Sequence, residues 1–217
     1  VLFYCNSSVV DKEGKQVGHT DTYFHEVWRE SRWDDDFTSI GVAELAGYQC
    51  RGQTVPNMSS ALISTKAFRQ AYNPILKRFK LTGDWIFIGQ LMRHGQVVYC
   101  KRTLSNFRKH EETARVRVKS ARSQAEFMLT KYLLFRETGK PLRGLATTMA
   151  SDVIRFLHEP AKWYDVVKIM FKISPKASLR FGIIFLASLL MNGFLLKEFY
   201  QRYKRAKGNK NAGTNKT

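Results

Sequence analysis

The sequence predicts an α/β fold, in which a unit of mixed strands and helices is followed by helices alone. Two short runs near the start and middle, VLFYCNSSVV and QVVYC, have the β-branched and aromatic composition of buried strands. From about Ser120 onward, the apolar side chains recur at helical spacings and no strand pattern returns. Hydrophobic residues make up 44% of the chain, which is enough for a sizeable packed core. Such an order of elements is typical of an α/β unit with a helical extension.

The first unit is expected over residues 1–118. Its opening reads as strand, polar turn and strand, with Gly14 able to adopt the positive φ of the turn. A loop in TVPNMSSALIST leads into a short strand, and KAFRQAY then forms a helical segment that Pro74 ends. Residues 84–94 carry apolar side chains at spacings of three and four, which predicts an amphipathic helix before the strand QVVYC.

The second unit, residues 119–207, is expected to be helical throughout. Its first helix lies in SQAEFMLTKYLLFRET, and Gly139-Lys140-Pro141 ends it. Further helices are expected at about 143–158, at 160–172 and from Pro175 onward. Residues 208–217 are rich in Gly, Asn and Lys and are predicted to be disordered.

The formal net charge of +18 implies an anionic partner, which could be nucleic acid, anionic lipid or a phosphorylated substrate. The basic residues are not interleaved with aromatics in an RNA-binding or DNA-binding motif, so a nucleic-acid-binding module is supported by charge alone. Cys5, Cys50 and Cys100 have no metal-site or disulfide spacing, which indicates a reducing, cytoplasmic environment. The chain opens with Val1 inside a predicted strand, and we therefore expect it to be a fragment.

An uncharged stretch of sixteen residues, Phe181–Leu196, lies between Arg180 and Lys197. A membrane-spanning helix needs about 20 apolar residues, so a core helix, an interfacial helix and a marginal span all remain open. From Lys162 to the end, twelve basic residues stand against two acidic ones. This balance favours an anionic membrane surface as a partner, with a soluble helical bundle as the alternative.

Three groups of residues suggest chemistry. Asp84 lies in the first turn of a predicted helix, where a carboxylate interacts favourably with the helix dipole and also suits a general base. Arg108 and His110 lie two residues apart on an extended segment, a geometry that suits a phosphate or diphosphate, or else a solvated basic edge. Asp34–Asp36 could hold a divalent cation, but their flanks favour a solvated acidic loop.

Several of these features recur in a known order. An Asn-x-Ser-Ser loop at 57–60 precedes a strand, and Gly-Asp-Trp at 83–85 opens a helix. A strand and an aromatic-Arg-x-His segment at 107–110 follow. In this order and spacing, residues 1–118 resemble the C-terminal half of a bacterial family 2 glycosyltransferase catalytic domain. The resemblance implies an incomplete GT-A-like, Rossmann-related half-domain.

The resemblance also implies roles for individual residues. Asp84 would be the catalytic base, and Trp85 would help to form the wall of the sugar site. The loop beneath the acceptor would contain Asn57, Ser59 and Ser60. Arg108 and His110 would approach the donor diphosphate or its metal ion.

The implied reaction is an inverting transfer of sugar from a nucleotide-sugar donor to a glycan or lipid-linked acceptor. It would serve cell-surface polysaccharide or lipopolysaccharide synthesis at the cytoplasmic face of a bacterial membrane. The intact enzyme would use Mg or Mn, but Asp34–Asp36 do not match the family's DxD motif, which lies upstream with the nucleotide-binding half. The chain alone is therefore expected to be inactive. A non-catalytic, membrane-attached remnant of a transferase is the alternative.

Overall fold

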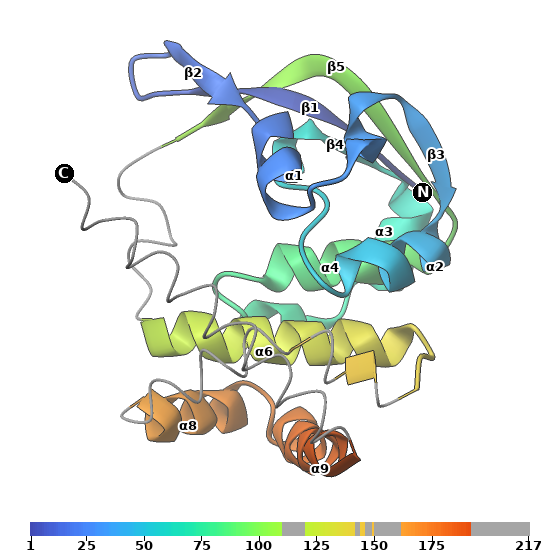
Figure 1. Cartoon of the computed structure of the whole chain (residues 1–217). Helices are drawn as coiled ribbons and strands as arrows, with labels where there is room; N and C mark the ends of the chain where they lie inside the picture. Colours follow the sequence, from blue (N-terminus) through green and yellow to red (C-terminus); the bar gives the residue numbers. More distant parts are fainter. Residues whose placement is uncertain (110–119, 142–143, 146–148, 150–161, 192–217) are drawn as a thin grey trace, which may run out of the picture.

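A curled mixed sheet lies on one side of the molecule, and helices are layered beneath it (Figure 1). The computed structural model describes residues 1–109, 120–141, 144–145, 149 and 162–191. The α/β class predicted from the sequence is confirmed. The narrower prediction, a GT-A-like half-domain, stays a prediction.

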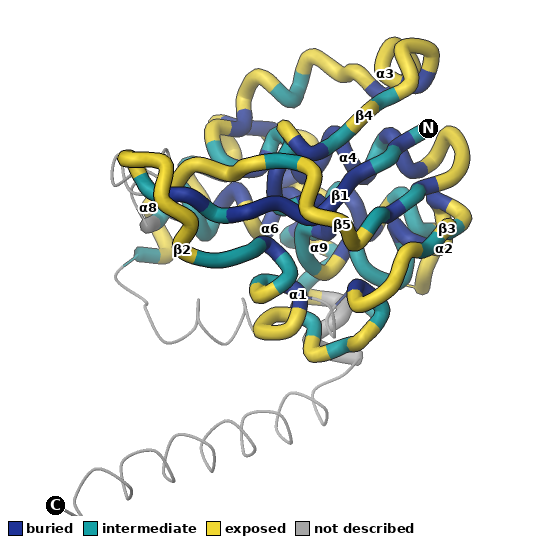
Figure 2. Tube along the Cα trace, turned by 90° about the horizontal axis from the view of Figure 1, so that it is seen from above, coloured by how far each residue is buried: buried dark blue, intermediate teal, exposed yellow. Residues whose placement is uncertain are grey.

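Strand β1 (Leu2–Val10) is the centre of the sheet. It pairs in parallel with β5 (Gln96–Arg108) on one edge and antiparallel with both β2 (Gln16–His19) and β4 (Ala61–Ile63) on the other. On the outer side of β5, β3 (Phe37–Ile40) pairs antiparallel, which gives the order β2-β1-β5-β3. Most residues of β1 are buried, as a strand covered on both edges and packed against helices requires (Figure 2).

The predicted hairpin at the start of the chain is confirmed. Gly14 has a φ of 87°, and its N–H donates to the Asp11 carbonyl at 3.2 Å between β1 and β2. The stretch from residue 20 to residue 60 forms one short strand and several short helical segments. The helical segments are α1 (Asp21–Val27), η1 (Ser31–Asp34), α2 (Gly41–Glu44), η2 (Leu45–Gln49) and η3 (Met58–Ser60).

The helix α4 (Gly83–Met92) corrects one prediction, because it is not amphipathic. Seven of its ten residues are buried, since the sheet lies on one side and α6 (Ser120–Glu137) on the other (Figure 1). A Cβ at Gly89 would lie 2.3 Å from Leu134 Cδ2, so glycine allows the close approach of the two helices. The apolar residues at spacings of three and four form only one face of α4, and the other faces of this helix are apolar as well.

Two more helical segments precede α4 in the chain. The predicted helix before Pro74 is α3 (Thr65–Ala71), and η4 (Pro74–Arg78) follows it. Beneath α6 lie α8 (Trp163–Ile173) and α9 (Pro175–Met191), with Pro175 at the predicted start (Figure 1).

A second hydrophobic cluster joins the extension to the first unit. Buried side chains of α6, α8 and α9 pack together with Phe79 and Ile86, which come from the first 118 residues. The predicted boundary near residue 118 therefore separates two patterns of secondary structure. It does not separate two cores, because the second cluster contains side chains from both units.

Several predictions concern residues outside the described ranges. They are most of the helix at 143–158, residues 192–196 of the uncharged stretch, and the tail at 208–217. Within the described part of the stretch, Phe181 is buried against Tyr132, with ring centroids 5.7 Å apart. None of the described helices combines the length and apolar character needed to cross a membrane.

Candidate active site

A cavity of about 650 Å³ lies where β5 ends and α4 begins. Three segments that are far apart in the sequence form its walls. The lining residues are Pro56, Asn57, Met58, Phe79, Lys80, Leu81, Gly83, Asp84, Phe107, Arg108 and Lys109. The structure therefore brings together three of the residues that the sequence singles out: Asn57, Asp84 and Arg108.

The half-buried carboxylate of Asp84 is fixed by two hydrogen bonds. Its Oδ1 accepts the backbone N–H of Trp85 at 2.7 Å, and its Oδ2 accepts Gln53 Nε2 at 3.2 Å. A carboxylate has about four lone-pair positions, so it can accept a further hydrogen bond from a ligand hydroxyl. Asp84 lies in the first turn of α4, where the helix dipole favours its negative charge.

Gln53 is a residue of this site that sequence reasoning missed. Its Nε2 donates to the Val55 carbonyl at 3.0 Å as well as to Asp84, and its backbone carbonyl accepts the Tyr23 hydroxyl at 3.1 Å. These bonds fix the loop before the cavity and aim the amide at the carboxylate. A glutamine 31 residues before an aspartate carries no recognisable spacing in the sequence.

Glu126 of α6 holds the segment that leads into α4. Its side chain is buried, and it accepts the backbone N–H groups of Lys80 at 3.0 Å, Leu81 at 2.7 Å and Thr82 at 3.3 Å. Arg122, one turn earlier on α6, forms an ion pair with Glu126 at 2.7 Å. The buried charge is thereby neutralised and hydrogen-bonded, as such a charge requires.

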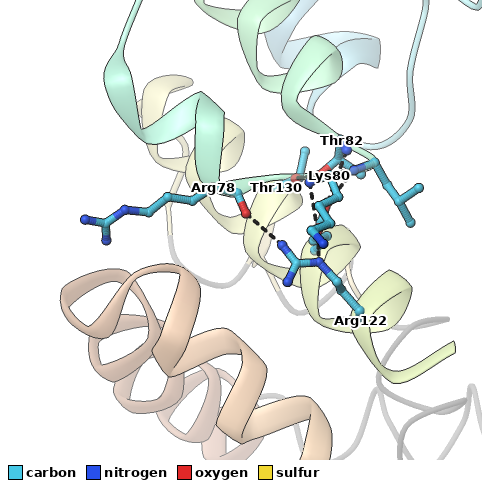
Figure 3. Close-up of polar contacts among 7 residues, drawn as sticks. Arg78, Lys80, Thr82, Arg122 and Thr130 are labelled. Atoms are coloured by element: carbon cyan, nitrogen blue, oxygen red, sulfur yellow. Dashed lines mark hydrogen bonds and ion pairs between the residues drawn. The ribbon is translucent and has the colours of Figure 1, made fainter. Parts of the chain in front are cut away.

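Further polar contacts extend this link between the two units (Figure 3). Arg122 Nη2 donates to the Arg78 carbonyl at 2.8 Å, and the hydroxyls of Thr82 and Thr130 lie 2.7 Å apart. Arg78 in turn donates to the Ile173 carbonyl at the end of α8, at 3.1 Å. The backbone before Asp84 is therefore positioned by the helical extension.

Asn57 organises the loop on the opposite wall. Its Nδ2 donates to Ser7 Oγ at 3.1 Å, and its Oδ1 accepts the N–H of Ser59 at 3.1 Å, capping η3. Ser60 is buried, and its hydroxyl donates to the Asn57 carbonyl at 2.7 Å. Asn57 and Met58 line the cavity, whereas Ser59 and Ser60 support the loop from outside it.

Trp85, which the resemblance places in the wall of the sugar site, is buried in the core, and that role stays a prediction. It is 4% exposed and does not line the cavity. Its Nε1 donates to the Gln49 carbonyl at 2.6 Å, and Gln49 Nε2 donates back to the Trp85 carbonyl at 3.0 Å. The indole faces the core because it follows Asp84 by one residue, and adjacent residues on a helix point about 100° apart.

The rim beside Asp84 is basic. Arg108 ends β5, is exposed, and donates through Nη1 to the carbonyls of Asp11 at 3.1 Å and Lys12 at 2.8 Å. Lys80 and Lys109 line the same cavity. Three cations and one carboxylate therefore line the same cavity. His110, the other predicted diphosphate residue, lies outside the described residues.

The acidic loop Asp34–Asp36 lies at the sheet, away from this cavity. Its carboxylates are exposed, Asp36 accepts the Lys101 backbone N–H at 2.8 Å, and Asp35 pairs with the Lys101 ammonium at 2.8 Å. Trp33 anchors the loop by donating to the Tyr4 hydroxyl at 3.0 Å. The predicted exposed acidic loop is confirmed.

Comparison of the chain with models of known families, with curated proteins and with solved structures found no match. The family resemblance therefore rests on the residues themselves. The arrangement as it stands offers a fixed carboxylate, which can accept a proton from a hydroxyl, and cations close enough to bind an anionic group in the same cavity.

Proposed function

We propose that this chain is the acceptor-side half of an inverting, family 2 (GT-A-type) glycosyltransferase. The enzyme would transfer a sugar from a nucleotide-sugar donor to a hydroxyl of a glycan or lipid-linked acceptor. The observation that carries the proposal is the position of Asp84 in a cavity of about 650 Å³ that Arg108 and Lys109 also line. Its place would be the cytoplasmic face of a bacterial membrane, where cell-surface polysaccharide or lipopolysaccharide is made.

The reaction needs two things that this cavity offers. An acceptor hydroxyl attacks the anomeric carbon of the donor, and a base must take its proton from a distance of about 3 Å. Asp84 supplies that base, with Gln53 fixing its orientation. The departing diphosphate needs positive charge, which Arg108, Lys80 and Lys109 would provide. Attack is direct, so no second catalytic carboxylate is required.

The metal ion expected for the intact enzyme does not fit the described residues. They contain no group of three or more His, Cys, Asp or Glu side chains that could hold one. The described residues therefore supply no metal-binding group to this cavity.

One observation favours the alternative, a non-catalytic transferase remnant. Arg108 already donates two hydrogen bonds to the turn between β1 and β2, so its guanidinium has a structural role without any ligand. The catalytic reading requires that Arg108 also reaches a diphosphate in the cavity.

The Asp84→Asn variant, made in the polypeptide that carries this chain with its nucleotide-binding half, separates the two readings. Release of nucleoside diphosphate from a panel of sugar nucleotides should fall by about 10²-fold or more, the usual scale for a lost general base. Donor binding and melting temperature should stay unchanged, and Asp34→Asn, an exposed acid away from the cavity, should keep full activity. Near-normal turnover of Asp84→Asn, or an unaltered protein with no transfer, would contradict the proposal.

A further inference from the structure

The helices α8 and α9 lie on the side of the molecule that faces away from the sheet (Figure 1). Both helices expose large apolar side chains. They recur at spacings of three and four, so each helix carries one stripe. The exposed fractions are 73% for Tyr164, 43% for Val167, 44% for Phe171, 58% for Leu179, 61% for Ile183 and 61% for Leu186. We call these six residues the outer apolar face.

The two stripes are continuous with each other. A groove of about 180 Å³ lies between the helices, and Val167 and Phe171 of α8 line it together with Leu186 of α9. The same groove reaches down to Met128 of α6. Because residues of both stripes share one groove, the outer apolar face is a single surface.

Cations border this surface. Lys168, Lys172, Lys176 and Arg180 are exposed and follow one another across the junction of the two helices. The Lys168 ammonium lies 5.5 Å from the ring centroid of Tyr164, so this cation is in contact with a member of the face. In the sequence from residue 162 to residue 191, Asp165 is the single acidic residue. The surface is therefore both apolar and strongly positive.

We propose that the outer apolar face docks this protein on an anionic lipid surface, with α8 and α9 lying in the headgroup region. Interfacial helices combine an apolar stripe with flanking Lys and Arg, which is the pattern found here. Apolar burial and attraction of the cations to the leaflet would act together. The inference goes beyond the proposed transferase and holds whatever the role of Asp84.

A second copy of the chain fits this surface less well. In a symmetric dimer the same patch is used by both copies, so the cations of one would face the cations of the other. The outer apolar face also differs from the interfacial helix that the sequence offers in the uncharged stretch Phe181–Leu196. Phe181 is buried inside the bundle, whereas Tyr164, Val167 and Phe171 of α8 are three of the six residues of the outer apolar face.

Two sets of variants test the apolar and the charged contributions separately. The probes are vesicles of phosphatidylcholine alone and of phosphatidylcholine mixed with phosphatidylglycerol, and the readout is co-sedimentation of the full chain. Leu179→Ser with Ile183→Ser should lower the partition coefficient at least about tenfold on the mixed vesicles. Leu62→Ser on β4, which is 71% exposed, is the matched control and should bind like the unaltered chain.

The charge set replaces Lys172, Lys176 and Arg180 by Gln. Binding to the mixed vesicles should fall about a hundredfold, while the weak binding to neutral vesicles stays the same. Exposed cations on the sheet side, changed as Lys15→Gln, Lys66→Gln and Arg69→Gln, provide the control. High salt should weaken binding to the mixed vesicles without abolishing it, because apolar burial persists when charges are screened.

Three results would overturn the inference. The first is that the unaltered chain stays in the supernatant with the mixed vesicles. The second is that both variant sets bind like the unaltered chain, which would assign binding to residues outside the face, such as 192–217. The third is a dimer, seen by sedimentation without lipid, that only Leu179→Ser with Ile183→Ser disrupts; the face would then be a contact between copies.

Discussion

The carboxylate of Glu126 accepts the backbone N–H of Leu81 at 2.7 Å, three residues before Asp84. It also accepts the N–H groups of Lys80 and Thr82, and Arg122 neutralises it (Figure 3). The helical extension thus holds the backbone that leads into α4. The N-cap residue Thr82 makes no side-chain cap bond of its own, and its hydroxyl lies 2.7 Å from that of Thr130. The position of Asp84 depends on a residue from the other unit.

The Glu126→Ala variant should lose about 3–5 kcal/mol of unfolding free energy, measured by urea denaturation. The change removes the acceptor of three backbone N–H groups and leaves the cation of Arg122 without its partner. Glu126→Gln, which keeps one carbonyl acceptor, should lose less.

A second glutamate of α6 serves as the control. Glu137 pairs with Arg93 at 2.5 Å, but both side chains are partly exposed, so Glu137→Ala should cost less than about 1 kcal/mol. Equal losses in Glu126→Ala and Glu137→Ala would show that the link between α6 and α4 adds little to stability.

The Gln53→Leu variant should slow sugar transfer about tenfold in the intact enzyme. Leucine has a similar size but cannot donate to Asp84 Oδ2, so the carboxylate would lose one of the bonds that orient it. Gln53 acts through Asp84, so kcat should fall while KM for the donor stays constant. A change confined to the donor KM would place Gln53 in substrate binding instead.

The Arg108→Ala variant should weaken binding of a nucleoside diphosphate to the intact enzyme by about 1–3 kcal/mol, the usual contribution of charge-assisted hydrogen bonds. Isothermal titration calorimetry measures the loss. Arg102→Ala is the control, since Arg102 lies on the same strand but does not line the cavity. From the sequence, His110→Ala is expected to weaken nucleoside diphosphate binding in the same way. If Arg108→Ala and Arg102→Ala bind the nucleotide alike, Arg108 only braces the turn between β1 and β2.

The elements that sequence predicts well are those fixed by local chemistry. Gly14 turns the first hairpin because glycine adopts a positive φ without strain. Pro74 follows the end of α3 and Pro175 opens α9, because proline lacks the N–H that the interior of a helix uses. The apolar period of α6 is equally visible because it extends over 18 residues.

What the sequence could not predict depends on contacts across long separations. The burial of α4 on all sides results from strands and a helix that surround it, and its own residues do not specify those partners. Strand β3 has only four residues and follows three aspartates, so it gives no strand signal. Gln53 lies 31 residues from Asp84, and Glu126 lies 45 residues from Leu81. Only the fold reveals these two supporting residues.

The last prediction concerns the buried ion pair of Glu44 and Arg32. Glu44 is 1% exposed, and Arg32 Nη2 lies 3.0 Å from its carboxylate. Burial raises the pKa of Glu44 above its ordinary value of 4.5, and the neighbouring Arg32 only partly offsets this effect. The folded state therefore holds the proton of Glu44 more tightly than the unfolded chain does.

The sign of the pH effect follows from that difference. Glu44 contributes most to stability below about pH 4.5, and this contribution is lost as the pH rises through the folded pKa. Glu44→Gln cannot titrate, so its unfolding free energy should rise relative to that of the unaltered protein as the pH increases from 4.5. Arg32 should stay in place in the variant, because its guanidinium lies 4.0 Å from the ring centroid of Phe37 and 4.3 Å from that of Tyr48. Urea denaturation at several pH values measures the difference. A difference that is flat, or that falls with rising pH, would mean that Arg32 outweighs burial at Glu44.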